Sequence, residues 1–180
     1  MIFVAVGTQK FQINRLLIKL DELVEQGVIR DRIFAQTGSC TYIPRHFEST
    51  PFLTKEEFEH RIDECDFVIT HSGVNTSVSA LKAEKKIIVF PRLEKYHEHV
   101  DDHQCQIADA FEKKNYVLFC KDENDLAEKI NEINDFHPDR YRSQRINVVQ
   151  TIDSYLQAQE QGRRSRTGRK SPHRSAKKKS

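Results

Sequence analysis

Short apolar segments alternate with helical patterns six times along this chain of 180 residues. The apolar segments are rich in β-branched residues and stay apolar at successive positions, which is typical of strands covered on both faces. They are Ile2–Val6, Arg32–Gly38, a segment ending at Pro51–Leu53, Asp66–Thr70, Lys86–Pro91 and Tyr116–Cys120. Parallel strands need crossover connections long enough for a helix, so the alternation predicts an α/β domain with a parallel sheet.

Local signals place the ends of the intervening helices. Apolar residues at helical spacing before Gly27 predict a helix that ends at this glycine. Thr54 with Glu57 forms a capping-box pattern, and Asp122 is placed to cap another helix. A last helix is expected near Arg140–Gln157.

The end of the chain differs in charge from the rest. The whole chain carries 29 basic and 27 acidic residues, and nine of the basic ones lie after Gln161, which leaves 20 against 27 in the body. We therefore divide the chain into a folded domain, residues 1–157, and a basic tail, residues 158–180, that is too polar to order itself. The tail is either solubilising or attracted to an anionic membrane surface or nucleic acid. For the domain we predict no nucleic-acid partner.

The cysteines and the apolar segments indicate a cytoplasmic protein. The four cysteines have no C-x-x-C spacing, and Met1 leads straight into a strand-like segment rather than a signal peptide. No segment approaches the roughly 18 apolar residues of a membrane span. We expect a cytosolic chain with reduced thiols.

Polar loops follow four of the predicted strands. They are residues 7–9, 37–39, 71–76 and 92–104. In open parallel sheets ligands bind at the carboxyl ends of the strands, so these loops should converge on one crevice.

The segment ITHSGVNTS takes a buried strand through small residues into a helix. Free amides and the positive end of the helix dipole suit a phosphate or a diphosphate. The alternative is an ordinary strand-to-helix turn capped by Ser or Asn. The sequence contains neither G-x-G-x-x-G nor G-x-x-x-x-G-K-[ST], so the usual dinucleotide and P-loop interpretations lack support.

The segment EKYHEHVDDHQ, residues 94–104, allows three interpretations. His97, His99 and Asp101 fit the start of the metallo-hydrolase pattern H-x-H-x-D-H, but Asp102 stands where that pattern requires His. Metal coordination distances tolerate little displacement, so we predict no metal site here. The other interpretations are a solvated polar loop and a rim that contacts a ligand, in which Gln104 could donate to and accept from sugar hydroxyls.

These motifs together resemble a known family. VAVGTQKF, QTG, THSGVNTSVSALKAEKKIIVFPR and YHEHVDDHQCQIA, in this order, resemble the C-terminal domain of family 28 glycosyltransferases. The resemblance is to small bacterial subunits for capsular or exopolysaccharide synthesis, akin to the catalytic subunit of the eukaryotic dolichol-linked UDP-N-acetylglucosaminyltransferase. It implies a Rossmann-like parallel sheet of about six strands with helices on both faces, which is one half of a GT-B enzyme.

The resemblance also implies a set of donor-binding residues. They are Gly7, Thr8 and Gln9 beside the donor, Thr37 and Gly38 of QTG, Phe52 and Leu53 at uracil, His71, Ser72, Gly73, Val74, Asn75 and Thr76 at the diphosphate, and Asp102, His103 and Gln104 at the sugar. Two positions depart from the family pattern. Asn75 replaces a glycine of the diphosphate turn, where we expect it to adopt the left-handed conformation that Asn tolerates. Ser79 replaces a glutamate that binds the ribose in many relatives.

The resemblance finally implies a partner and a mechanism. A GT-B enzyme has two Rossmann-like halves, so we expect the acceptor half on a membrane-anchored second subunit that holds this chain at the inner face of the membrane. The pair would transfer a hexose from a UDP-sugar to a lipid-linked saccharide with inversion, without a metal or other cofactor. We assign no catalytic base to this chain and expect the base on the partner. The alternatives are a non-catalytic nucleotide-sugar-binding or regulatory subunit and, further removed, a zinc hydrolase.

Overall fold

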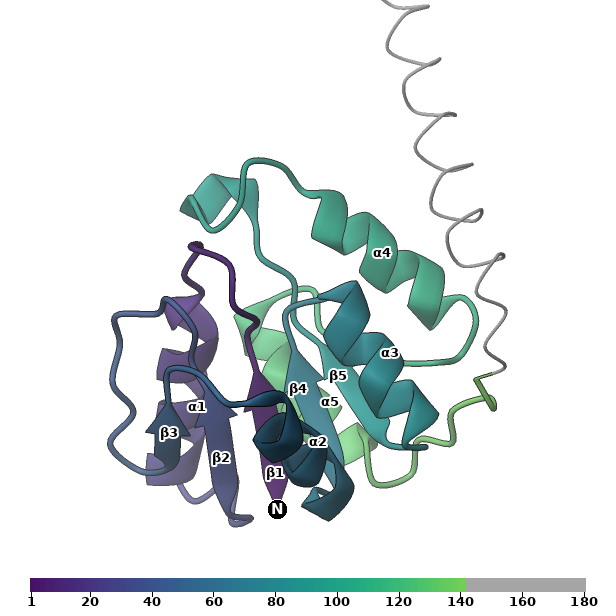
Figure 1. The fold of residues 1–180 in the computed structure, drawn as a ribbon, viewed down its shortest axis with the longest axis horizontal. Coiled ribbons are helices and arrows are strands. Elements are labelled where there is room, and N and C mark those ends of the chain that lie inside the picture. The colour runs from purple at the N-terminus through teal and green to yellow at the C-terminus, as the bar shows by residue number, and fades with distance from the viewer. Residues whose placement is uncertain (142–180) are drawn as a thin grey trace, which may run out of the picture. The chain divides into compact units, whose positions relative to one another are not determined.

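In the computed structural model, which describes residues 1–141, six short strands form one parallel sheet in the order β3-β2-β1-β4-β5-β6 (Figure 1). The strands are β1 (Ile2–Ala5), β2 (Ile33–Gln36), β3 (Glu48–Thr50), β4 (Phe67–Thr70), β5 (Lys86–Val89) and β6 (Leu118–Phe119). The chain builds outward from β1 to β3 and then crosses back to β4 on the other side of β1. This order places the topological switch point of the sheet between β1 and β4.

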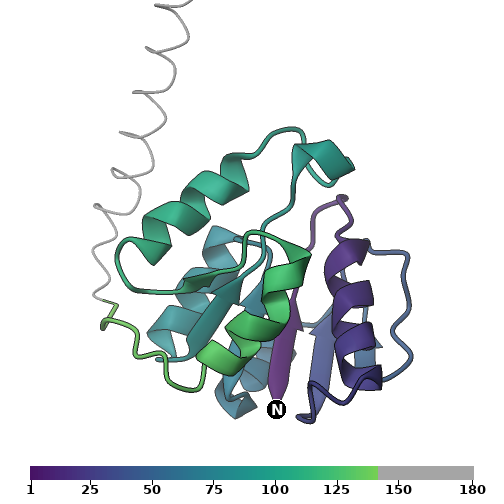
Figure 2. The ribbon, with the colours of Figure 1, turned by 180° about the vertical axis from the view of Figure 1, so that it is seen from behind.

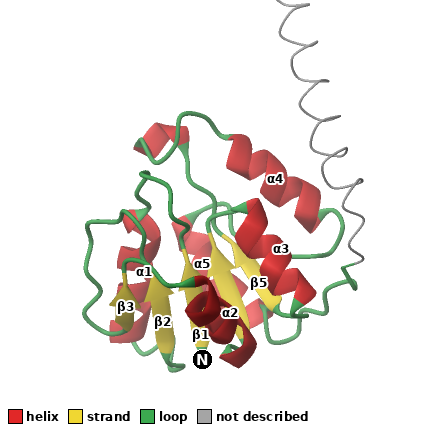
Figure 3. Ribbon diagram, in the orientation of Figure 1, coloured by secondary structure: helices red, strands yellow, loops and turns green. Residues whose placement is uncertain are grey.

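Helices cover both faces of the sheet (Figures 2 and 3). One face packs against α1 (Asn14–Glu25) and α5 (Leu126–Glu132), and the other against α2 (Lys55–Glu64) and α3 (Val74–Lys82). The short helix η1 (Glu94–Tyr96) and α4 (His103–Glu112) follow β5 and lie toward the carboxyl ends of the strands, and η2 (Glu123–Asp125) precedes α5. The expected α/β architecture is therefore confirmed.

The central strand β1 shows why the apolar segments form strands. Its residues are fully buried. Ile2 and Val4 belong to the core formed with α1 and α5, whereas the Phe3 ring lies 5.3 Å from the Phe58 ring of α2. Since successive side chains of a strand point to opposite faces, only an apolar residue at every position fits a strand covered on both sides.

Two predicted helix ends are confirmed by their hydrogen bonds. After α1, the Gly27 N–H donates to the Val24 carbonyl and the Val28 N–H to the Leu23 carbonyl, both at 2.9 Å, while Gly27 adopts a φ of +72°. Before α2, the Thr54 hydroxyl accepts from the Glu57 N–H at 3.2 Å, and the Glu57 carboxylate accepts from the Thr54 N–H at 2.8 Å. Both motifs use only neighbouring residues, which is why the sequence could predict them.

The third strand differs from its prediction. It ends at Thr50 rather than at Pro51–Leu53, because Pro51 has no N–H to donate to the ladder. The Pro51 carbonyl still accepts a hydrogen bond from the Gly38 N–H at 2.8 Å. The expected helix near Arg140–Gln157 falls almost wholly outside the described residues, as does the tail at residues 158–180. Within residues 1–141, no helix is both long and apolar enough to cross a bilayer.

Candidate functional site

A pocket of about 400 Å³ lies at the switch point between β1 and β4. It is lined by the loop after β1, the last residue of β2, the segment that leads from β3 into α2, and the turn after β4. Of the four polar loops predicted to converge on one crevice, residues 7–9 and 71–76 meet here, whereas residues 37–39 and 92–104 are not in the lining. Its lining comprises Gly7, Thr8, Gln9, Gln36, Leu53, Thr54, Lys55, Phe58, His71, Gly73, Val74, Asn75 and Thr76. The loop after β1 and the turn after β4 are thus brought together, although they are more than 60 residues apart in the chain.

The N-terminus of α3 faces this pocket without a side-chain cap. Gly73 is the N-cap residue and cannot supply a side-chain acceptor. The first intrahelical bond runs from the Ser77 N–H to the Gly73 carbonyl at 3.0 Å, so the amides of residues 74–76 precede it. These residues line the pocket, and amides of a helix N-terminus suit a bound anion.

His71 fills the space between two glycines of the pocket wall. A Cβ at Gly7 would lie 2.5 Å from His71 Cε1, and a Cβ at Gly73 would lie 2.6 Å from the same atom. Its Nδ1 lies 3.3 Å from the Ala5 carbonyl, which favours the tautomer that carries a proton on Nδ1. Burial, followed by the nearby Arg92 charge, lowers the pKa of His71 to about 4, although the Ala5 carbonyl opposes the shift. The imidazole is therefore neutral at physiological pH.

The left-handed residue of the turn is Ser72 and not Asn75. Ser72 has a φ of +70°, whereas Asn75 lies in the first turn of α3. The expectation that Asn75 takes over a left-handed glycine position is therefore wrong. A serine in this conformation costs about 1–2 kcal/mol, and its hydroxyl, which is buried, donates to the Gln104 carbonyl at 2.8 Å. This bond joins the turn after β4 to the start of α4.

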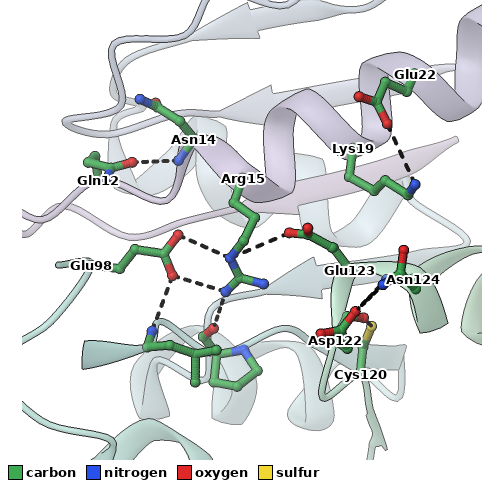
Figure 4. A network of polar contacts seen from close by, with 12 residues as sticks. Gln12, Asn14, Arg15, Lys19, Glu22, Glu98, Cys120, Asp122, Glu123 and Asn124 are labelled. Atoms are coloured by element: carbon green, nitrogen blue, oxygen red, sulfur yellow. Dashed lines mark hydrogen bonds and ion pairs between the residues drawn. The ribbon is translucent and has the colours of Figure 1, made fainter. Parts of the chain in front are cut away.

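Arg15 clamps the segment after β5 to α1 (Figure 4). Its guanidinium donates to the Glu98 carboxylate at 2.9 and 3.3 Å and to the Pro91 carbonyl at 3.1 Å. The same group lies 4.3 Å from the Phe90 ring and 4.8 Å from the Tyr96 ring. Glu98 is buried and also accepts from the Leu93 N–H. The largely buried ion pair between Arg15 and Glu98 thus fixes the segment that precedes α4.

The predicted sugar-side residues lie outside the lining of the switch-point pocket. The Gln104 side chain is buried, and its oxygen accepts from the Arg92 N–H at 3.1 Å. The Asp102 carboxylate accepts from the Glu94 N–H at 2.8 Å, and the His103 N–H donates to Asp101 at 3.1 Å. These bonds shape the turn into α4. The contact of Asp102, His103 and Gln104 with a sugar stays a prediction.

Four more predicted residues are not in the lining of the pocket. The Thr37 N–H donates to the Thr50 carbonyl at 2.9 Å, and a Cβ at Gly38 would overlap the Gly7 carbonyl. Ser72 is held as described above. Phe52 is 55% exposed beside the lining residue Leu53. Gly38 therefore lies against the loop after β1, and Thr37 is bonded to β3.

Sequence reasoning missed several residues of this region. Gln36 lines the pocket and donates to the Gly7 carbonyl at 3.3 Å; its signal is a polar residue at the carboxyl end of an apolar strand. Lys55, in the first turn of α2, is the one cation among the lining residues. Arg15, Glu98 and Arg92 acquire their roles from contacts 76 to 86 residues away in the chain, for which no local pattern exists.

A second hollow, of about 410 Å³, lies over α1 and the segment after β5 (Figure 4). Its charged groups are paired with one another: Arg15 with Glu98 and Glu123, and Lys19 with Glu22. It does not lie at the switch point. We therefore take the pocket between β1 and β4 as the candidate site.

The histidine-rich segment forms no metal cluster. His97 is exposed with a φ of +56°, while His99 Nδ1 pairs with Asp101 Oδ1 at 3.1 Å. Among residues 1–141, no three His, Cys, Asp or Glu side chains are grouped so as to hold a metal ion. The groups that line the switch-point pocket are amides, the neutral His71 imidazole, hydroxyls and the Lys55 ammonium group.

Known proteins resemble this chain in sequence and in fold. The sequence matches the glycosyltransferase family 28 C-terminal domain over residues 1–160. It is 25% identical over 134 residues to the UDP-N-acetylglucosamine transferase subunit ALG13 of Mus musculus, and this match covers 66% of the chain but 10% of the mouse protein. The chain thus spans about a tenth of the length of that relative.

Three solved glycosyltransferases share the fold. The glycotransferase of kitacinnamycin has a TM-score of 0.53 at 14% identity, and the match covers 73% of this chain and 34% of that protein. SnogD from Streptomyces nogalater has a TM-score of 0.52 at 18% identity, and the match covers 74% of this chain and 34% of SnogD. MurG of Acinetobacter baumannii also has a TM-score of 0.52 at 18% identity, and the match covers 73% of this chain and 40% of MurG.

The expected Rossmann-like half of a GT-B enzyme is confirmed as a fold by these similarities and by the strand order. Because the family match extends over residues 1–160, the chain belongs to the family of glycosyltransferase family 28 C-terminal domains.

Proposed function

We propose that this chain is the donor-binding subunit of a two-component inverting glycosyltransferase that moves a hexose from a UDP-sugar to a lipid-linked saccharide. The observation that carries the proposal is the pocket between β1 and β4, into which an uncapped helix N-terminus faces beside His71. Such a helix end suits the diphosphate of a nucleotide sugar. The printed name of the mouse relative, a UDP-N-acetylglucosamine transferase subunit, supports both the UDP-sugar and the subunit character.

Each part of the donor has a proposed binding segment, either in the lining of the pocket or outside it. We assign the uracil to Phe52 and Leu53, the diphosphate to the amides of residues 73–76 with His71, and the sugar to residues 102–104. Amides fixed at a helix terminus stabilise the charge that develops on a leaving diphosphate without any reorganisation. The proposal therefore includes no metal or other cofactor, and it places the base that deprotonates the acceptor on the partner.

We assign the acceptor-binding half of the enzyme to a second polypeptide. The solved relatives are covered by this chain to 34–40%, and the described residues form one Rossmann-like sheet. We propose a membrane-anchored acceptor-binding subunit that holds this chain at the cytoplasmic face of the membrane, in capsule or exopolysaccharide synthesis. The alternative from another class is a non-catalytic nucleotide-sugar-binding or regulatory subunit.

The test is sugar transfer by the reconstituted pair. The full chain is co-expressed with a candidate membrane-anchored half, and label from a panel of UDP-hexoses, including UDP-N-acetylglucosamine, is followed into lipid extracts with and without EDTA. We expect transfer only when both chains are present, and no loss with EDTA. Transfer by the membrane half alone would favour the regulatory alternative, and activity that depends on stoichiometric zinc would overturn the metal-free assignment.

Gln104→Ala tests the proposed contact of residue 104 with the sugar in the same assay. Loss of a hydrogen bond to a sugar hydroxyl costs on the order of 1–3 kcal/mol, so transfer should fall roughly ten- to a hundredfold while UDP binding hardly changes. Gln106→Ala, two residues along the same helix, is the matched control. If Gln104→Ala lowers the affinity for UDP as much as for the UDP-sugar, residue 104 is not on the sugar side.

A further inference from the structure

Arg92 is a fully buried cation that forms no ion pair with any of residues 1–141. The residue follows β5 and is 0% exposed. Its Nη2 donates to the Val6 carbonyl at 2.7 Å and to the Phe11 carbonyl at 2.9 Å. Within the described part of the chain, its Nε and Nη1 are buried and have no hydrogen-bond partner. A buried charge without compensation is costly, so this arrangement calls for an explanation.

The position of Arg92 relates it to the switch-point pocket. In the sheet, β5 neighbours β4 and β4 neighbours β1. A side chain that starts after β5 and reaches Val6 after β1 must therefore cross the carboxyl end of β4, where His71 begins the diphosphate turn. The charge of Arg92 is close enough to contribute to the low pKa of His71. The guanidinium thus lies behind the two loops that line the pocket.

The hydrogen bonds of Arg92 also hold one of these loops. Val6 and Phe11 are the residues on either side of the loop that carries Gly7, Thr8 and Gln9. A single guanidinium nitrogen joins both carbonyls. Arg92 therefore fixes the separation between the two ends of the loop after β1.

The neighbouring Arg15, unlike Arg92, is paired with a carboxylate of the described chain. Glu98 is the buried carboxylate of this region, and both of its oxygens are bound by Arg15. Glu98 acts on Arg92 electrostatically but accepts no hydrogen bond from it. The charge of Arg15 is neutralised by Glu98, whereas the charge of Arg92 has no carboxylate partner among the described residues and can interact with a bound anion.

We propose that Arg92 is the positioning residue that carries the charge for the donor diphosphate. It sets the loop after β1 and keeps an uncompensated positive charge behind the pocket, which a bound diphosphate offsets. The inference rests on the proposed function, because it takes the ligand to be a nucleoside diphosphate. An ion pair across a partly desolvated pocket is stronger than one in water, so the diphosphate should sense this charge without touching it.

The test compares UDP with uridine, which lacks the phosphates. Dissociation constants for both are measured for the wild type, for Arg92→Gln, which is neutral but keeps an N–H donor for the Val6 carbonyl, and for Arg92→Lys, which keeps the charge. We expect Arg92→Gln to weaken UDP binding at least about tenfold more than uridine binding, and Arg92→Lys to recover most of this difference. Arg15→Gln is the matched control and should leave the ratio of the two constants unchanged.

A loss that is equal for UDP and uridine in Arg92→Gln would make Arg92 a purely structural residue and overturn the inference. The same holds if Arg15→Gln changes the ratio as much as Arg92→Gln does. If Arg92→Gln does not fold, Arg92→Met is the second neutral variant for the same comparison. A wild-type chain that binds neither UDP nor uridine would contradict the proposed function itself, which is a different result from either of these.

Discussion

The two hollows of this molecule are similar in volume, about 410 Å³ over α1 and about 400 Å³ at the switch point, but opposite in the state of their polar groups. Over α1, Arg15 and Lys19 are paired with carboxylates from their own surroundings (Figure 4). At the switch point, an uncapped helix N-terminus lies beside a neutral histidine, and the buried Arg92 behind them has two nitrogens without a partner among residues 1–141. The difference teaches that binding capacity is indicated by polar groups left without partners and not by the size of a hollow.

The largest effect that we expect from this comparison is on the free energy of unfolding at acidic pH. His71 has a pKa of about 4 in the folded protein against an ordinary value of 6.5. Between these values the unfolded chain binds a proton that the folded protein excludes, so stability falls as the pH falls from about 6.5 to 4. The loss from this one group amounts to about 3 kcal/mol and does not grow below pH 4.

Denaturant unfolding at pH 7 and pH 4.5 measures this loss. We expect His71→Gln to lose most of the pH dependence in this window and His60→Gln, which replaces an exposed histidine of α2, to keep it. An unchanged pH dependence in His71→Gln would mean that the imidazole is not held neutral between Gly7 and Gly73, and the contrast between the two hollows would weaken.

A methyl group added at Gly73 should weaken ligand binding in the switch-point pocket, with a smaller change in free energy than that expected for His71. In Gly73→Ala, the new Cβ would lie 2.6 Å from His71 Cε1 and 2.8 Å from Nε2. The ring must shift from its place between Gly7 and Gly73, which changes the wall of the pocket and should weaken UDP binding about tenfold, or 1.4 kcal/mol. Calorimetric titration of UDP measures the change.

Gly27→Ala is the control for that variant. Gly27 has a φ of +72° and nothing within 4 Å of a Cβ, so alanine costs stability through backbone strain, about 1 kcal/mol, but touches no site residue. UDP affinity should stay at the wild-type value. If Gly73→Ala binds UDP as well as Gly27→Ala does, the turn after β4 does not hold the diphosphate.

The sequence predicts the fold well because its signals are local. The β-branched segments, the glycine that ends α1 and the Thr54–Glu57 capping box each depend on residues within a few positions of one another. The end of β3 was misplaced because the polar segment Glu48–Thr50 is a strand by virtue of its neighbour β2, whereas the apolar residues after Pro51 are not.

The sequence predicted only those parts of the site that lie in loops directly after a strand. The loop after β1 and the turn after β4 were found because small polar residues follow buried strands. The contacts of Arg15 with Glu98 and of Arg92 with Val6 join residues 83 and 86 positions apart, so they exist only once the sheet has formed. The same holds for Ser72, whose left-handed conformation is supported by the distant carbonyl of Gln104.

The most direct test of the central claim is a UDP titration of the isotope-labelled chain followed by amide chemical shifts. We predict that the largest shifts fall on Gly7, Thr8 and Gln9 and on residues 73–76, with the amides of Arg15, Lys19 and Glu98 nearly unchanged. Shifts centred on Arg15 and Glu98, or no saturable shifts at all, would contradict the assignment of the switch-point pocket as the donor site.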